Sequence, residues 1–436
     1  MSWLVHLPAL VKVGVCFGGV IVASRLKVNL GLALGAGGVL LGVWMGMGPG
    51  AVAQVAASAL TSALAIRLAA IVVLILGLSH LMASTGQLKR IVETFSALVR
   101  SPKAVAAVMP ALIGLLPMPG GALFSAPMVE SACCSGPEHP HPLPSTPRGA
   151  ALLAVVNYWF RHHGEYWWPL YPGLILCVAL LGVPTWRFMA LTIPIAALHL
   201  AAGAAILLPR LKLAAAPARP RGKLRNFVSE AAPIWVVAAA PAVVGVAHLL
   251  VSRSGASWPL PEGSALIMGL VAAIAVVGFA QHLPLGQVFK ALGRPANLGM
   301  VTLVGGVVLF QAFMKGSGAV GQVQAELRAL GIPTVAMVLA LPFISGVLTG
   351  IAVGYVAASF PLVLPLVHSM AGADMVVWGM VAFVAGFVGM MLSPVHLCFL
   401  LSRDYFKAPF STCYRLLVGP LAVVCAGLMA WWWVLS

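Results

Sequence analysis

The sequence is dominated by a succession of apolar runs, each about as long as a membrane is thick. A membrane-spanning helix needs about 20 predominantly apolar residues. Runs of this kind lie at residues 4–23, 28–46, 63–84, 188–208, 230–252, 264–282, 297–314 and 412–434. Charged residues make up only 8% of the chain, against about a quarter in soluble domains. We therefore predict an all-α polytopic membrane protein without a separate soluble domain.

Four further apolar segments do not fit a single straight crossing. Residues 104–129 and 333–365 are interrupted at their centres by proline and glycine, and we interpret them as re-entrant hairpins. Residues 150–184 and 375–406 are too long, because roughly 35 residues at about 1.5 Å each exceed a hydrocarbon core of about 30 Å. We interpret these two segments as discontinuous helices. Irregular backbone inside a membrane survives only where protein or a water-filled cavity surrounds it, so the breaks predict a shared buried site.

The basic residues indicate how the chain is oriented. The net charge is +16, but the lysines and arginines lie singly or in short groups between apolar runs, which argues against nucleic acid as a partner. The first apolar run contains Lys12 and has no basic residue before it, which predicts an anchored helix rather than a cleaved signal. With both termini outside, only Arg187, Arg253, Lys315 and Arg328 fall in outer loops, in agreement with the positive-inside rule.

The two halves of the chain resemble each other. HLMASTGQL (80–88) parallels AFMKGSGAV (312–320), and FSAPMV (124–129) parallels ASFPLV (358–363). Each half is expected to contain three spans, an amphipathic helix, a hairpin, a discontinuous helix and a final span. The orientation predicted above makes this an inverted repeat, and chance similarity between apolar segments is the alternative for any single match. The predicted boundaries are a first repeat at 1–208, a basic cytoplasmic linker at 209–229 and a second repeat at 230–436.

The hairpin tips supply the first group of candidate substrate-binding residues. Helix ends near the middle of a membrane carry partial charges that suit anionic substrates and their coupling ions. The first tip offers Pro119, Gly120, Gly121 and Ser125, and the second offers Ser345, Gly346, Thr349 and Gly350. Small residues also allow close packing of membrane helices, and this is the alternative interpretation of the second tip.

The discontinuous helices supply the second group. The first is expected to break near Trp167–Gly173, after a stretch that contains Asn157, Arg161, His162 and Glu165. Charges inside a membrane are costly and mark functional sites, and Arg161 and Glu165 are spaced to pair on one helical face. An interfacial arm rich in tryptophan and tyrosine is the alternative.

The second discontinuous helix is expected to break at LSPVH (392–396), which places Ser393 and His396 at a comparable depth. The alternative for His396 is a packing role. The seven cysteines show no zinc-binding spacing and are interpreted as packed apolar residues. The segment EHPHPLPSTP (138–147) is interpreted as a linker rather than a metal site. No HExxH, GxSxG or phosphate-loop signature is present, so we predict neither an enzyme nor a resident cofactor.

Three longer motifs resemble a known family. LPMPGGALFSAPMV (116–129), NYWFRHHGEYWWPLYPG (157–173) and SPVHLCFLLSRDYFKA (393–408) are similar to the bacterial and archaeal membrane proteins of domain-of-unknown-function family 401, in the ion transporter superfamily. The resemblance implies a cytoplasmic membrane location, an elevator-type fold, a homodimer, and sodium or protons as the coupling ion. The Ser-Asn-Thr sodium signatures of the dicarboxylate branch are not present.

These features together predict a secondary active transporter for a small organic anion, because Arg161, the histidines and the helix N-termini outweigh the single carboxylate of Glu165. A lipid-linked phosphate flippase is the first alternative. An intramembrane enzyme that uses Glu165, His162 and His396 as acid and base is the second.

Overall fold

The computed structural model describes residues 7–26, 28–99, 101–115, 121–134, 146–211, 222–253, 263–368, 370 and 372–435. Over these ranges every regular element is a helix. The first half contains α1 (Ala9–Arg25), α2 (Leu30–Trp44), α3 (Pro49–Leu60), α4 (Ala63–Ser84), α5 (Gln87–Ser96), α6 (Pro102–Gly114), α7 (Ala122–Cys134), α8 (Pro147–Arg161), η2 (His163–Tyr166), α9 (Pro172–Leu181), α10 (Thr185–Ile206) and η3 (Leu208–Arg210). The second half contains α11 (Leu224–Glu230), α12 (Ala232–Arg253), α13 (Ser264–Ala280), α14 (Leu285–Leu292), α15 (Pro295–Gly316), α16 (Ala319–Ala329), α17 (Thr334–Thr349), α18 (Ala352–His368), α19 (Met375–Met391), α20 (Leu397–Tyr405) and α21 (Phe410–Leu435).

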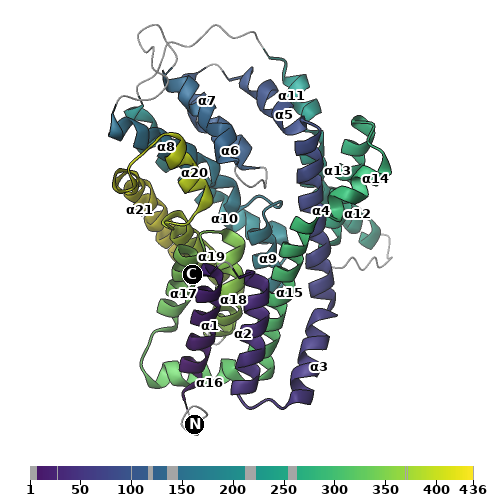
Figure 1. Ribbon diagram of the computed structural model, residues 1–436, viewed down its shortest axis with the longest axis vertical. Coiled ribbons are helices and arrows are strands. Elements are labelled where there is room, and N and C mark those ends of the chain that lie inside the picture. The colour runs from purple at the N-terminus through teal and green to yellow at the C-terminus, as the bar shows by residue number, and fades with distance from the viewer. Residues whose placement is uncertain are drawn as a thin grey trace.

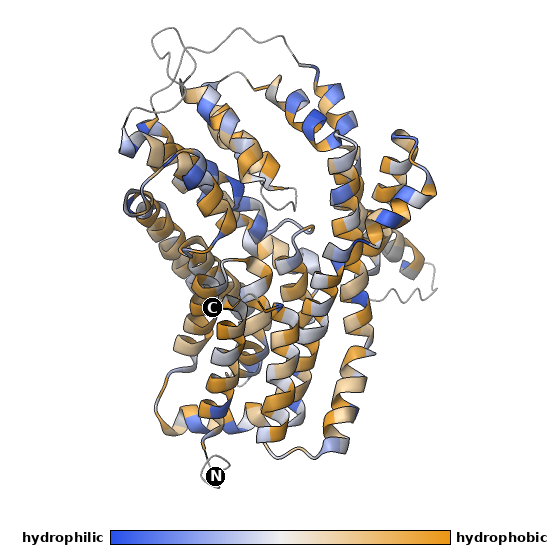
Figure 2. Cartoon of the chain, viewed as in Figure 1, coloured by the Kyte–Doolittle hydropathy of each residue, from blue (hydrophilic) through white to orange (hydrophobic). Residues whose placement is uncertain are grey.

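The helices have the length and surface of membrane spans. Four helical stretches within the described residues are long and apolar enough to cross a membrane: Ala63–Ser84, Thr185–Arg210, Asn297–Gly316 and Phe410–Leu435. Large apolar side chains face outward, such as Phe279, which is 81% exposed, and Trp433, which is 78% exposed. Figure 2 shows that the long helices are mainly hydrophobic, whereas polar residues gather in α5 and α11 at one end. A surface of this kind belongs in lipid, so the chain is a membrane protein.

Local sequence signals start several of these helices. The Asn29 side chain accepts hydrogen bonds from the first amides of α2, and Asp374 does the same for α19. Ser62 caps α4, and α6 and α9 carry proline in their first turn. Such residues satisfy or remove the amides that a helix N-terminus leaves without partners.

From α4 and α15 onward, the two halves contain similar helices in the same order. Helices α4 and α15 each have 22 residues, and each is followed by a short amphipathic helix, a helix pair, an interrupted helix and a long final helix. Figure 1 shows α5 at one end of the molecule and α16 at the other. The short helices α3 and α14, which the apolar pattern did not predict, precede α4 and α15.

Each amphipathic helix is attached to the beginning of the other half. The Glu326 carboxylate in α16 accepts hydrogen bonds from the first two amides of α1, at 2.6 and 2.7 Å. In α5, Gln87 donates to the Glu230 carbonyl at 2.9 Å, and Arg90 forms an ion pair with the Glu230 carboxylate at 3.0 Å. A carboxylate at a helix N-terminus satisfies orphan amides and the positive end of the helix dipole.

The predicted hairpins are pairs of packed helices. Helix α6 packs against α7, and α17 packs against α18. The second pair turns at Gly350, whose φ of +66° suits glycine better than other residues. Pro119 and Gly120, predicted for the first tip, lie outside the described residues.

The interrupted helices follow the prediction with one correction. Helix α19 ends at Met391 and α20 begins at Leu397, which agrees with the expected break at 392–396. The break between α8 and α9 spans residues 162–171, so it begins earlier than the expected Trp167–Gly173. The reason lies at Gly164, where a β-carbon would approach the Leu115 side chain to 2.9 Å, so the turn fits beneath the end of α6. As a consequence, Arg161 and Glu165 do not share a single α-helical face.

Candidate functional site

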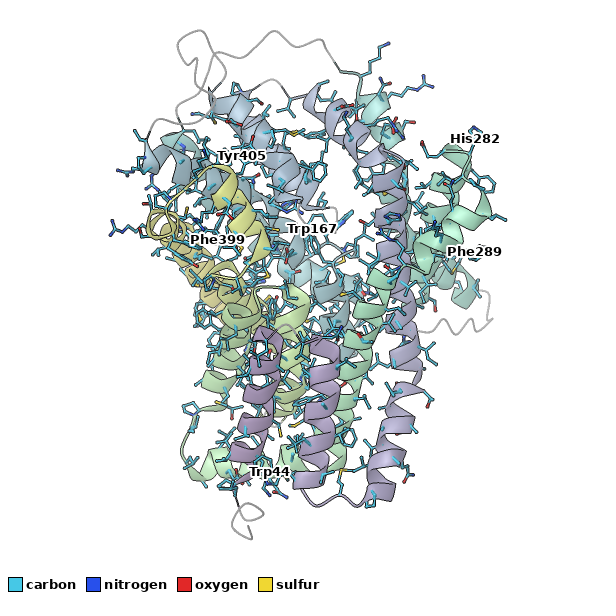
Figure 3. All side chains as sticks on the ribbon, in the orientation of Figure 1. Trp44, Trp167, His282, Phe289, Phe399 and Tyr405 are labelled. Carbon is cyan, nitrogen blue, oxygen red and sulfur yellow. The ribbon has the colours of Figure 1, made fainter. Side chains whose placement is uncertain are left out.

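The two breaks meet inside the protein, although about 235 residues of chain separate them. The Tyr158 hydroxyl in α8 lies 3.1 Å from the Met391 carbonyl and 3.2 Å from Nδ1 of His396. The His162 and His396 rings are 4.7 Å apart and nearly perpendicular. Trp167, which belongs to the first break, lies near the middle of the molecule in Figure 3, whereas His282 lies at its periphery. The breaks therefore place polar side chains at the centre of the fold.

The turns within each break satisfy their own backbone. Trp168 N–H donates to the Gly164 carbonyl at 2.8 Å, and Ser393 N–H donates to the Met390 carbonyl at 3.0 Å. Backbone groups that are paired locally can be buried without the penalty of several kcal/mol that an unpaired group carries in an apolar medium. This explains how non-helical segments persist at this depth.

The first helix pair closes over the end of α8. A β-carbon at Gly121 would lie 2.6 Å from the guanidinium carbon of Arg161, so a larger residue at this position would displace the guanidinium. Asn157 donates one hydrogen bond to the Ala122 carbonyl at 3.0 Å and another to Ser402 Oγ at 2.9 Å. Asn157 thus joins the start of α7 to α20.

The second helix pair closes over the other break. A β-carbon at Gly350 would lie 2.9 Å from Ser393 Oγ and 3.0 Å from the backbone nitrogen of His396. Ser393 Oγ donates to the Val347 carbonyl at 2.7 Å, which fixes the last turn of α17. A β-carbon at Gly173, in the first turn of α9, would lie 2.7 Å from that of Ala352 at the start of α18. The two helix pairs and the two helix breaks, which we call the four interrupted segments, therefore come together.

Arg161 is the charged group at this meeting point. It is 4% exposed, hydrogen-bonds the Cys398 side chain and attracts the Glu165 carboxylate electrostatically. As the last residue of α8, it lies at the negative end of that helix dipole, which stabilises a cation. Asn157 and His162 are also fully or almost fully buried. This burial contradicts the alternative of an interfacial arm.

The two histidines are held by similar contacts. Nδ1 of His162 lies 2.6 Å from the Tyr158 carbonyl, and Nδ1 of His396 lies 3.3 Å from the Met390 carbonyl. A carbonyl oxygen only accepts hydrogen bonds, so the close contact of His162 assigns its proton to Nδ1 and leaves its Nε2 with a lone pair. Nδ1 of His396 lies near both a carbonyl oxygen and the Tyr158 hydroxyl, and these two contacts suit different tautomers. Nε2 of His162 lies 3.7 Å from a Glu165 oxygen.

The remaining predicted residues lie around the second helix pair or within α7. The Ser345 hydroxyl donates to the Leu341 carbonyl at 2.7 Å, and the Thr349 hydroxyl donates to the Ser345 carbonyl at 2.8 Å. A β-carbon at Gly346 would lie 2.6 Å from the Met390 nitrogen, so this glycine allows α17 to contact α19. Ser125 is fully buried and bonds within its own helix. These placements agree with the packing alternative more than with open ligand contacts.

Cys398 lies at the candidate site, although its place in an apolar run predicted only a packed residue. Its sulfur and one ring nitrogen from each of His162 and His396 lie within 4.8 Å of one another. Cys398 is only two residues from His396, but His162 comes from a distant segment, so the sequence shows no metal-binding spacing here. Ser402 and Tyr158 were not predicted as site residues for the same reason, since their hydrogen-bond partners lie in the other half of the chain.

The fold and its centre define a polytopic helical membrane protein in which two helix pairs and two interrupted helices surround a buried arginine. The chain belongs to the family described as "Protein of unknown function (DUF401)", whose model matches residues 11–251 and 263–435. The family predicted from the three motifs is therefore confirmed.

A solved structure shares this fold. It is described as "Crystal structure of the Alcanivorax borkumensis YdaH transporter reveals an unusual topology", and it matches with a TM-score of 0.52 and 17% identity. The match covers 87% of this chain and 86% of that chain. At this identity the likeness concerns the fold alone. A search of curated proteins finds no match.

Proposed function

We propose that the protein is a secondary active transporter that moves a small organic anion across the bacterial or archaeal cytoplasmic membrane. The observation that carries this proposal is the placement of Arg161, a buried cation where the four interrupted segments meet. Buried ionisable groups in membrane proteins mark substrate and ion pathways. Interrupted helices place their N-termini near anionic substrate groups in many transporter folds, and the shared fold with a transporter supports the same conclusion.

The mechanism we propose is an elevator movement of an inverted repeat, in a homodimer with both termini outside. The helix packing supports two bodies. Helix α2 packs mainly against α15, and α13 packs against α4 and α12, whereas α8 packs against α6, α20 and α21. The final helices α10 and α21 pack against each other and against the interrupted helices, so we assign them to the moving body. The sodium or proton gradient is the proposed energy source.

Arg161 provides the direct test. Replacing Arg161 with alanine removes a charged hydrogen-bond donor, and hydrogen bonds to charged groups contribute about 1.5–3 kcal/mol each. We expect anion affinity to fall by about 10- to 100-fold. Affinity is measured by thermal-shift screening of sugar acids, dicarboxylates, sulfonates and phosphates, with and without sodium. Binding is then quantified by calorimetry and uptake by proteoliposome assays.

Arg187→Ala is the matched control. Arg187 pairs with Asp374 at 2.8 Å, and its side chain is 51% exposed. Asp374 caps the N-terminus of α19, whereas the break follows the C-terminus of that helix. This variant should transport normally. Unchanged anion affinity in a folded Arg161→Ala protein would remove Arg161 from the site and with it the basis of the proposal.

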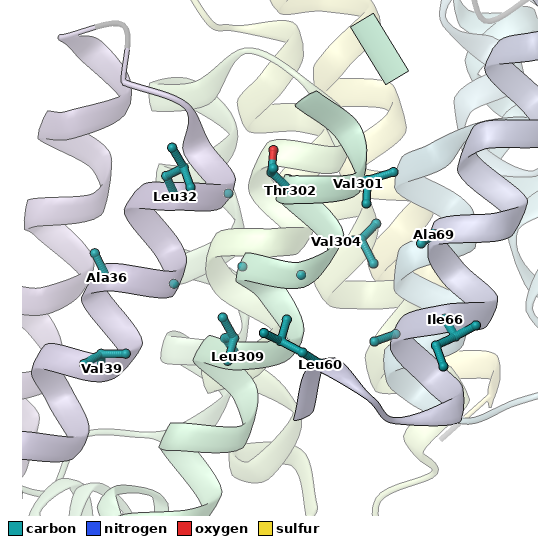
Figure 4. Close-up of a pocket in the computed structure, with 15 residues that line it drawn as sticks. Leu32, Ala36, Val39, Leu60, Ile66, Ala69, Val301, Thr302, Val304 and Leu309 are labelled. Atoms are coloured by element: carbon teal, nitrogen blue, oxygen red, sulfur yellow. The ribbon is translucent and has the colours of Figure 1, made fainter. Parts of the chain in front are cut away.

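The flippase alternative needs a charged site that is open to lipid. A groove of about 550 Å³ lies between α2, α4 and α15, and Figure 4 shows its lining. Thr302 supplies a hydroxyl, which donates to the Gly299 carbonyl at 2.8 Å. The residues that line this groove include no charged side chain. The groove therefore suits acyl chains rather than a phosphate headgroup, and the anion transporter remains our proposal.

A further inference from the structure

Three side chains at the meeting point carry the donor atoms of a transition-metal site. The Cys398 sulfur and one nitrogen each from His162 and His396 lie within 4.8 Å of one another. In a tetrahedral zinc site, bonds of about 2.0–2.3 Å place neighbouring ligand atoms about 3.3–3.5 Å apart. Small side-chain rotations that move the donor atoms by roughly 1 Å would therefore bring them to tetrahedral spacing.

The histidine rings are already oriented as ligands. Both Nδ1 atoms face backbone carbonyl oxygens, at 2.6 Å for His162 and 3.3 Å for His396. In metalloproteins, a hydrogen bond of this kind from the second ring nitrogen fixes the tautomer and orients the ligand. The lone pair on Nε2 of His162 is then available to an ion.

The cluster lies close to the protein surface. His396 is 4% exposed, but its neighbours Val395 and Leu397 are 39% and 47% exposed. Cys398 is itself partly exposed.

We infer that His162, His396 and Cys398 bind a divalent transition-metal ion of the zinc class, and that the transported anion completes its coordination. Imidazole and thiolate ligands select zinc, cobalt and copper ions over magnesium and calcium. Three protein ligands leave the fourth position of a tetrahedral ion open to an exchangeable group. This second part rests on the proposed function and narrows the substrate class to small carboxylates that coordinate such metals.

The surrounding charges are compatible with this arrangement. Metal binding converts the Cys398 thiol to a thiolate and releases its proton to solvent. The Arg161 guanidinium hydrogen-bonds the sulfur. A carboxylate bound to the metal and hydrogen-bonded to Arg161 would supply negative charge between the two cations.

Cobalt binding to the purified full-length protein tests the metal site without any anion. We expect one Co²⁺ to bind per chain with a thiolate-to-cobalt charge-transfer band. Cys398→Ser should abolish the band, and His396→Gln should weaken binding by about tenfold or more. The matched controls are Cys425→Ser and His282→Asn, which replace an exposed cysteine and an exposed histidine. No band in the unmodified protein, or a band that persists in Cys398→Ser, would overturn the inference.

Alkylation of the unmodified protein gives a second test that needs no variant to fold. Zn²⁺ should slow the alkylation of Cys398 by about tenfold or more, measured by peptide mass spectrometry, and leave that of Cys425 unchanged. Equal rates for Cys398 with and without Zn²⁺ would contradict the site.

A chelator separates the inference from the proposed function. Loss of carboxylate uptake in the presence of a chelator, with recovery on adding Zn²⁺, supports both. Uptake that persists unchanged with the chelator overturns the inference that a metal ion takes part in anion binding, and it leaves the proposed transport function unaffected. Cobalt binding at Cys398 in a protein that transports no anion, with or without Zn²⁺, supports the metal site and overturns the transporter.

Discussion

Two glycines of the helix pairs separate the contribution of the site from that of packing. Gly121 and Gly346 both make close approaches, but to different kinds of atoms. A β-carbon at position 121 would lie 2.6 Å from the Arg161 guanidinium carbon, which is the end of a flexible side chain. A β-carbon at position 346 would lie 2.6 Å from the Met390 nitrogen, which belongs to the rigid backbone of α19.

The size of each effect follows from these contacts. Non-bonded carbon atoms prefer separations of about 3.5–4.0 Å, so Gly121→Ala displaces the guanidinium by roughly 1 Å. The displaced guanidinium keeps its charge but loses the geometry of a hydrogen bond worth at least about 1.5 kcal/mol, so we expect anion affinity to fall by about tenfold, no more than for removal of Arg161. Gly346→Ala instead forces α17 away from α19, and overpacking of this kind costs about 1–3 kcal/mol.

The assay combines thermal unfolding with anion binding on the two purified variants. Gly121→Ala should bind the anion about tenfold more weakly and unfold near the temperature of the unmodified protein. Gly346→Ala should unfold at a lower temperature and retain its affinity when measured in the cold. If Gly121→Ala binds normally, the side chain of Arg161 is not held in a binding geometry by this glycine, and the reasoning fails.

Three further perturbations test individual contacts. Ser393→Ala removes the hydrogen bond to the Val347 carbonyl and should destabilise the second helix pair by about 0.5–1.5 kcal/mol, seen as faster amide exchange in the last turn of α17. Glu326→Ala leaves the first amides of α1 without their carboxylate and should cost about 1 kcal/mol, seen as faster exchange confined to that helix end. Asn157→Leu keeps the volume but loses the bonds to Ala122 and Ser402, and should lower the unfolding temperature; an unaltered temperature would show that this bridge is dispensable.

The sequence predicted the breaks because the physics behind them is local. Proline and glycine inside an apolar run interrupt a helix wherever the run lies, and lipid excludes the irregular backbone that results. The turn at Gly350 and the interval between Met391 and Leu397 were predictable on these grounds. The first break was displaced from its expected position because its location depends on how Gly164 fits under Leu115, which is a tertiary contact.

The composition of the site was less predictable than its location. Arg161, His162 and His396 stand out as polar residues in apolar surroundings, and the structure places them together. Cys398 gives no such signal, because a cysteine in an apolar run is usually a packed residue. The signal from Gly346 is ambiguous, since a glycine near a tip serves equally for close helix packing, and this glycine does pack against α19. Only the partners decide between these uses, and the partners lie in distant segments.

The two amphipathic helices tie each half of the chain to the beginning of the other. Helix α16 is tied to the start of α1 through Glu326, and α5 is tied to Glu230 at the end of α11, directly before α12. The next residues lead directly into the helix pairs that close over the site. An elevator movement would therefore concentrate its backbone rotation between α5 and α6 and between α16 and α17. The second of these joints contains Gly331, with a φ of +64°. Hinges absorb such rotations at a few residues near element ends. The positions of these two hinges therefore follow from the contacts that anchor the amphipathic helices α5 and α16.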